Sequence, residues 1–255
     1  MIVYCLAAAC AIGVVIAASR LVRRTRGVDD ADPDGPTTAH TGAMLSALFL
    51  LAFAIAVVVP WTSADAARSN TYTESQAIAE AYWAASRLEA DDARHVQQGL
   101  RDYVDLVRGP EWSLMRHGRM SHRGWTELER LRRDVIAVKA GDDDELKDAR
   151  NLVLEQLGQI SSARRQRAMD AQNSPPAGLL IITVLTGVVI TLLPFLSGAR
   201  PRGMTLVPLC LMASLLAAGT YLTIDISHVF TGALAVGPEA FTSLHDDLQR
   251  IAEGG

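Results

Sequence analysis

Residues 177–196 read AGLLIITVLTGVVITLLPFL, and after a short turn residues 204–224 read MTLVPLCLMASLLAAGTYLTI. Neither stretch contains a charged side chain. A helix rises about 1.5 Å per residue, so roughly 20 apolar residues reach across a hydrocarbon core about 30 Å thick. The segment 177–224 therefore predicts a transmembrane hairpin, and this decides the class of fold.

A second pair of apolar segments lies at the start of the chain, within residues 1–62. Residues 1–19 and 43–61 are also free of charge. The connection between them is rich in Asp, Pro and Gly, which is typical of a flexible, acidic, hydrated loop. The sequence thus predicts an all-α integral membrane protein with four transmembrane helices. Its expected place is the cell membrane, as a multi-pass protein with the lipid bilayer as partner.

The 63–176 segment between the two hairpins is highly charged and has the periodicity of amphipathic helices. Its apolar side chains recur in three stripes: Val96, Leu100, Tyr103, Val104 and Val107; Trp125, Leu128, Leu131, Val135 and Val138; and Leu146, Leu152, Val153, Leu157 and Ile160. Turn residues predict breaks near 91–92, 109–110, 118–121 and 141–144. We expect an extramembrane helical bundle, whose first helix can run on from the second span. The tail, 225–255, adds a short amphipathic helix.

Arginines near the spans give the orientation only weakly. The two short loops hold six, and the opposite side holds five close to a span or in the tail. Basic residues in short loops are retained on the cytoplasmic side, but long domains cross regardless of their charge. The side of the membrane on which the 63–176 domain lies therefore stays open.

Motifs of enzymes are missing from the sequence. There is no Gly-rich phosphate loop, no Gly-x-Ser-x-Gly elbow and no His-x-x-x-His pair. We therefore expect no catalytic residue, no cofactor, no metal and no known small-molecule substrate. The formal net charge of −4 gives no reason to expect nucleic acid binding.

Hydroxyl and small side chains form the polar positions inside the predicted spans. Thr183, Gly187 and Thr191 recur four residues apart on one face of the third span, and Ser214 lies in the fourth. Small residues of this kind permit helices to approach closely. Hydroxyls that line a pore would leave the same pattern, so both interpretations stay open.

Charged residues next to the spans have two interpretations as well. Asp225 and His228 follow the fourth span, where they form either a polar site at a pore mouth or an ordinary helix end at the interface. Arg164, Arg165 and Arg167 precede the third span by about ten residues. They either contact anionic lipid head groups or form a solvated helix face.

Several short motifs stand out along the chain: a Glu-containing helix after span two, a Tyr…Glu-Trp segment, an Arg-x-x-Arg pattern before a proline-started span, and a tail ending in Pro-x-Ala-Phe. Besides the arginines, the residues that carry these motifs are Glu74, Tyr103, Glu111, Trp112, Phe230, Gly232, Pro238 and Phe241. Together the motifs resemble those of the bestrophin-like family of bacterial four-helix membrane proteins. The chain departs from the pattern at Val229, where the family has Pro, and it lacks a Trp early in the third span.

The resemblance implies a function by analogy with bestrophin anion channels, which are homo-oligomers around a central pore. It implies an oligomeric ion channel and a cytoplasmic main domain. The alternative is a non-transporting membrane scaffold or sensor whose helical domain binds a partner. A likeness of fold alone does not decide between these two functions.

Overall fold

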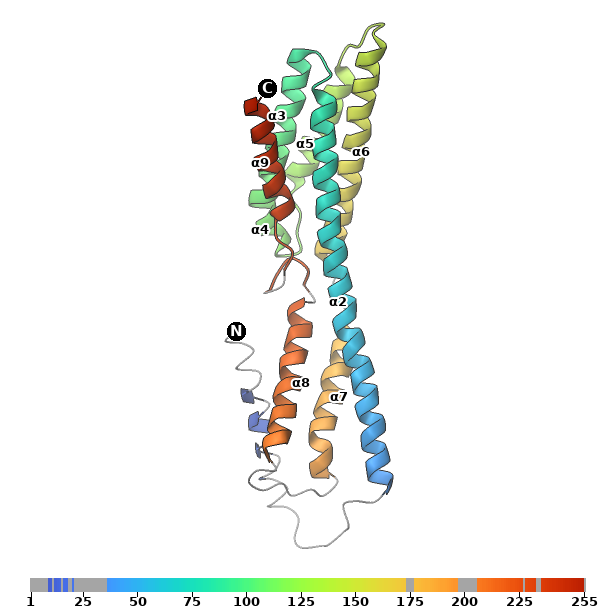
Figure 1. Cartoon of the computed structure of the whole chain (residues 1–255), viewed down its shortest axis with the longest axis vertical. Coiled ribbons are helices and arrows are strands. Elements are labelled where there is room, and N and C mark those ends of the chain that lie inside the picture. The colour runs from blue at the N-terminus through green and yellow to red at the C-terminus, as the bar shows by residue number, and fades with distance from the viewer. Residues whose placement is uncertain are drawn as a thin grey trace. The chain divides into compact units, whose positions relative to one another are not determined.

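The protein is described from a computed structural model that covers residues 9–10, 12–14, 16–17, 20, 36–172, 177–196, 206–226, 228–232 and 235–254. Within these ranges every regular element is a helix and none is a strand, so the predicted all-α class is confirmed (Figure 1). Most of the predicted first span and of the loop after it lies outside the described residues. No helix in the described ranges meets the length and hydropathy expected of a membrane span.

The packing of the chain divides it into two compact units. The apolar unit comprises residues 1–62 and 174–227, and the charged unit comprises residues 63–173 and 228–255. The chain therefore passes between the units three times, at residues 62–63, 173–174 and 227–228.

Helix α2 (Pro36–Ala85) contributes to both units. It begins within the loop that the sequence predicted, at Pro36, a residue that suits a first helical position because the amide it lacks has no partner there. Pro60, where the second span was expected to close, lies inside the helix. The predicted continuation of the second span into the helix that follows is therefore present in α2.

The apolar unit contains α7 (Ala177–Leu196) and α8 (Leu206–Ile226), which pack against each other. Helix α8 also approaches α2 closely, because a Cβ atom on Gly219 would lie 2.6 Å from the Phe53 ring. The outward side of α7 carries large aliphatic side chains that are exposed in the isolated chain, namely Ile181, Ile182, Val184, Leu185, Val188 and Val189.

The charged unit is a helical bundle. It contains the second part of α2, α3 (Ala90–Leu106), the π-helix η1 (Val107–Glu111), α4 (Trp112–Met115), α5 (His122–Ala137), α6 (Asp144–Gln172) and the tail helix α9 (Glu239–Gly254). Helix α3 packs against α5 and α9, and α5 packs against α6. The three predicted apolar stripes contribute to the core together with residues of α2, α4 and the tail, although Leu152 is exposed.

Turn chemistry ends most of these helices as expected. Gly118 and Gly141 adopt positive φ angles of 66° and 52° in the turns before α5 and α6. Ser121 caps α5 by accepting a hydrogen bond from the Arg123 amide at 3.2 Å. The predicted break at residues 109–110 is wrong, because the chain there forms the wider turns of η1. A π-helical insertion accommodates the missing amide of Pro110 without ending the helix.

Candidate functional site

Two carboxylates and two guanidinium groups lie fully buried in the charged unit. Glu74 comes from α2, Glu111 from the last position of η1, and Arg164 and Arg167 from α6. All four are 0% exposed. We call these four residues together with Tyr103 of α3 the ion cluster. Its formal charges cancel, which is the condition under which charges can be buried in a protein interior.

Arg167 joins both carboxylates of the ion cluster. Its Nε and Nη2 atoms donate to Glu74 at 2.7 and 2.9 Å, and its Nη1 atom donates to Glu111 at 3.0 Å. Burial alone would lower the pKa of the Arg167 guanidinium, but the negative charge of Glu74 and its hydrogen bonds outweigh burial and raise that pKa. Arg167 is therefore a permanently charged bridge between α2 and η1.

Arg164 makes the second bidentate pair. Its Nη1 and Nη2 atoms donate to the two Glu111 oxygens at 2.6 and 2.5 Å, and Nη2 also donates to the Ser121 carbonyl at 2.9 Å. The guanidinium carbon lies 4.8 Å from the centre of the Trp125 ring, within the range of a cation–π contact. This packing leaves no room at Gly124 of α5, where a Cβ atom would overlap the Arg164 guanidinium.

Tyr103 connects Glu74 and Arg164 within the ion cluster. Its hydroxyl donates to Glu74 Oε1 at 2.6 Å and accepts from Arg164 Nη1 at 3.2 Å. Burial, followed by the negative charge of Glu74, raises the pKa of Tyr103 well above its ordinary value. The phenol therefore stays protonated and serves as a hydrogen-bond donor throughout the physiological range.

An aromatic group covers the ion cluster on the side of the tail. Phe241 of α9 lies with its ring 5.3 Å from the Arg167 guanidinium carbon. Trp112 of α4 contacts both tail aromatics, with ring centres 6.0 Å from Phe241 and 5.5 Å from Phe230. The Ser75 hydroxyl of α2 donates to the Ala240 carbonyl at 3.0 Å. Residues of the tail thus contact α2, α4 and α6 next to the ion cluster.

The tail needs a sharp turn to reach this position, and two of its residues provide it. Gly232 has a φ angle of 103°, which a side chain would strain. The carbonyl of Pro238 accepts from the amides of Phe241 and Thr242 at 3.0 and 2.9 Å, which starts α9. All eight residues that carry the family resemblance besides the arginines therefore either join the ion cluster, cover it or shape the segment that covers it.

This arrangement corrects the lipid interpretation of two arginines. Arg164 and Arg167 are buried and paired with carboxylates, so they are not available to lipid head groups. Only Arg165 of the three is exposed. Sequence reasoning treated the run as one surface feature, and it missed that Glu74 and Glu111 supply the counter-charges.

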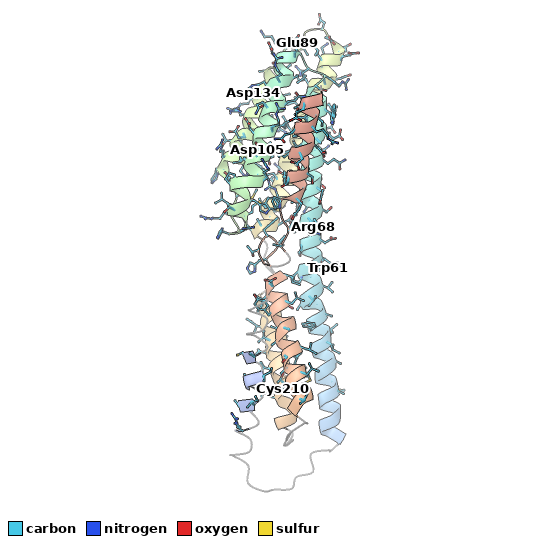
Figure 2. The ribbon with its side chains drawn as sticks, turned by 60° about the vertical axis from the view of Figure 1, so that its left-hand side comes forward. Trp61, Arg68, Glu89, Asp105, Asp134 and Cys210 are labelled. Carbon is cyan, nitrogen blue, oxygen red and sulfur yellow. The ribbon has the colours of Figure 1, made fainter. Side chains whose placement is uncertain are left out.

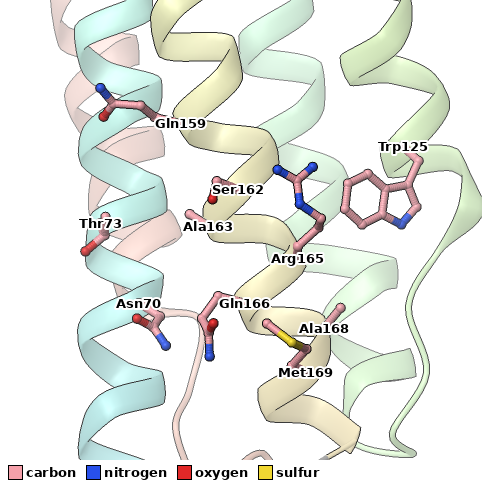
Figure 3. A pocket seen from close by; sticks show the side chains of 10 residues that line it. All are labelled: Asn70, Thr73, Trp125, Gln159, Ser162, Ala163, Arg165, Gln166, Ala168 and Met169. Carbon is pink, nitrogen blue, oxygen red and sulfur yellow. The ribbon is translucent and has the colours of Figure 1, made fainter.

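Arg165 lies at a surface groove between α2, α5 and α6 (Figure 3). The groove has a volume of about 670 Å³, and its lining residues are Asn70, Thr73, Trp125, Gln159, Ser162, Ala163, Arg165, Gln166, Ala168 and Met169. Arg165 is the one charged side chain among them. None of the ion-cluster residues lines the groove, but Trp125, which lines it, also contacts Arg164 of the ion cluster.

The predicted polar positions of the apolar unit lie on helix-packing and partly exposed faces. Thr183 is 1% exposed and Gly187 is buried, which places both against neighbouring helices. Thr191 is half-buried and donates to the Gly187 carbonyl at 2.8 Å, and Ser214 donates to the Cys210 carbonyl at 2.7 Å. The sequence pattern alone did not separate the buried hydroxyl at Thr183 from the others.

Asp225 and His228 lie on either side of the end of α8. Asp225 is half-buried in the last turn of the helix, and His228 is exposed at the start of the tail. Neither residue belongs to the ion cluster. Their interpretation as a polar site at a pore mouth stays a prediction.

A comparison with known protein families identifies the class to which this chain belongs. Residues 5–241 match the Bestrophin-like domain. Because this match covers most of the chain, the protein is a member of the Bestrophin-like family, as the motifs indicated. No curated protein and no solved structure matches the chain.

Proposed function

We propose that the protein is a multi-pass membrane protein with four transmembrane helices that forms an oligomeric ion channel of the bestrophin-like kind. The observation that carries the membrane part is the outward face of α7. It exposes six large aliphatic side chains in a stretch without charge. A contiguous apolar surface of this kind requires an apolar surrounding, and a bilayer supplies one.

The channel part rests on membership of the family and on the hydroxyls of α7. Thr183 is buried against neighbouring helices, so it serves packing in this proposal. Thr191 remains half-buried two turns further along the helix and is the better candidate for a pore surface. The chain carries no catalytic chemistry in this proposal, and the anion selectivity is an analogy with bestrophins.

Currents through planar bilayers test the proposal directly. The purified full chain should conduct, and Thr191→Val should change the single-channel conductance. Thr186→Val is the matched control, because its hydroxyl also bonds within α7, to the Ile182 carbonyl at 2.7 Å, but points in another direction around the helix. Absence of current from folded protein, or equal effects of the two substitutions, would remove the channel assignment.

A membrane scaffold or sensor is the second candidate, and the ion cluster favours it. The chain enters or leaves the charged unit at three points, in α2, after α6 and before α9. The ion cluster and its aromatic cover contain residues from all three of these segments: Glu74, Arg167 and Phe241. A partner that binds the charged unit would act on all three connections at once. Folded protein without current would leave this function in place.

A further inference from the structure

The turn between α4 and α5 carries a concentration of positive charge. Residues 112–126 read WSLMRHGRMSHRGWT, which includes three arginines, two histidines and no acidic residue. Arg116, Arg119 and Arg123 are all exposed, and 74% of the Arg123 side chain is accessible to solvent. We call these three arginines the basic turn.

The charges of the basic turn are largely without counter-charges. Among the residues that the structure describes, Arg116 and Arg119 have no ion pair. Arg123 has one distant partner, Glu127, whose carboxylate oxygen lies 3.9 Å from Arg123 Nε and whose other oxygen pairs with Arg130 at 3.3 Å. A cluster of charges of one sign attracts ions of the opposite sign. The basic turn is therefore available to an external anion.

The basic turn lies at the end of the charged unit where α6 ends. A Cβ atom on Gly118, in the middle of the turn, would lie 3.4 Å from the Ala171 carbonyl oxygen, one residue before the end of α6. Asn70 of α2 donates to Asp170 of α6 at 2.8 Å. The part of α2 that belongs to the charged unit therefore begins at this same end.

The tail also enters the charged unit at this end. The ring centre of Trp112, about one turn before Arg116, lies 5.5 Å from that of Phe230 at the start of the tail. All three passages of the chain between the units are therefore at one end of the charged unit, which we call the connected end. Figure 2 labels Arg68 close to the connected end and Glu89 at the opposite end. Because only four residues separate α6 from α7, a bilayer that holds the apolar unit comes nearest to the charged unit at the connected end.

We propose that the basic turn binds the phosphate groups of anionic lipids in the membrane that holds the apolar unit. This inference rests on the proposed membrane location. Guanidinium groups bind phosphate through paired hydrogen bonds, and each basic residue beside a span raises the affinity for an anionic leaflet about fivefold. The position of the arginines favours lipid over a nucleic acid, because binding of a nucleic acid gives no reason for them to lie at the connected end. The cations offered to lipid are thus those of the basic turn, whereas Arg164 and Arg167 are buried.

Fluorescence quenching in vesicles that contain the full chain tests this contact. The three natural cysteines are replaced by alanine, and Ser113→Cys, which is exposed about one turn before Arg116, carries a bimane label. The vesicles contain phosphatidylcholine and phosphatidylglycerol, and one of the two lipids carries a spin label near its glycerol. At equal amounts of spin label, phosphatidylglycerol should quench the bimane roughly twofold or more above phosphatidylcholine. Asp142→Cys is the control for position, because Asp142 is exposed in the turn between α5 and α6, and neither lipid should quench a label there.

Removal of charge provides the second test, with the same label at residue 113. Arg116→Gln together with Arg119→Gln should equalise quenching by the two lipids. Arg132→Gln together with Arg133→Gln is the matched control, because both arginines are exposed on α5 next to Asp134, which Figure 2 labels away from the connected end. This control should keep the preference for phosphatidylglycerol. Equal quenching by the two lipids in the chain with all its arginines, or equal losses in the two double variants, would overturn the proposal.

Retention of the chain in vesicles washed with alkali separates this contact from the membrane location. A chain that is retained but whose label at residue 113 is not quenched lacks the contact and keeps the membrane location. A chain that the wash removes has neither.

Discussion

Replacement of Arg167 by methionine should destabilise the protein far more than the same replacement at Arg165. Arg167→Met removes three hydrogen bonds to carboxylates and leaves Glu74 with a buried negative charge and no cation. Removing one partner of a buried ion pair costs about 3–5 kcal/mol. Arg165 is exposed two residues earlier on the same helix, so Arg165→Met should change the free energy of unfolding by no more than about 0.5 kcal/mol.

Thermal unfolding of the full chain in detergent micelles measures this difference. Trp112 and Trp125 flank the ion cluster, so tryptophan fluorescence becomes a local probe when Trp61 and Trp83 are replaced by phenylalanine in every variant. For a chain of this size, 1 kcal/mol shifts the Tm by roughly 2–4 °C, so Arg167→Met should lower it by about 6–20 °C. The double variant Glu74→Leu with Arg167→Met removes the pair together and should recover most of the loss.

The Tm of Arg167→Met also distinguishes a buried ion pair from a contact between Arg167 and lipid head groups. If Arg167 contacted head groups, Arg167→Met would weaken binding to anionic vesicles and leave the Tm unchanged. Equal Tm values for the Arg165 and Arg167 variants, or a double variant no more stable than the single one, would refute the argument from burial.

Two further predictions concern the space and the protonation of the ion cluster. Gly124→Ala should destabilise the protein although alanine favours helices, because its Cβ would displace the Arg164 guanidinium. Gly158→Ala, whose Cβ would have its nearest neighbour at 3.4 Å, should instead stabilise the protein by about 0.5–1 kcal/mol. Urea unfolding compares the two variants, and changes of the same sign in their free energies of unfolding would contradict the packing at Gly124. The raised pKa of Tyr103 means that only the unfolded chain ionises it above about pH 10, so stability is full below that pH and falls above it by up to about 1.4 kcal/mol per pH unit. This alkaline loss should be reduced in Tyr103→Phe and retained in Tyr72→Phe, and parallel profiles for the two variants would count against it.

Much of the helical architecture follows from sequence patterns that have a simple physical cause. Apolar side chains at helical spacing mark the buried faces of α3 and α5, and Gly118 and Gly141 mark turns because their φ angles are positive. The π-helix η1 could not be predicted in this way. Gly109 and Pro110 ordinarily end a helix, but here the segment stays helical while the next two side chains, Glu111 and Trp112, are buried in the tertiary structure.

Only some residues of the ion cluster could be identified from the sequence. Glu74, Tyr103 and Glu111 stood out as motif residues, but no local rule brings positions so far apart in the chain into contact. One signal was available on α6. The buried positions Val153, Leu157 and Ile160 continue at the same spacing of three and four residues to Arg164 and Arg167. A basic residue at a core position of a helix requires a buried acid, and this indicates pairing rather than lipid contact.

The bidentate bridge between Glu74 and Arg167 restricts how α2 can turn. Successive residues of a helix are separated by about 100° around its axis, so a rotation of α2 by a single position would carry the carboxylate away from the guanidinium. The hydrogen bonds of Arg167 are directional and have no alternative acceptor of equal charge on that face of α2. Helices α2 and α6 therefore keep a fixed rotation relative to each other. A rotation of either helix about its own axis has to be accompanied by a movement of the other.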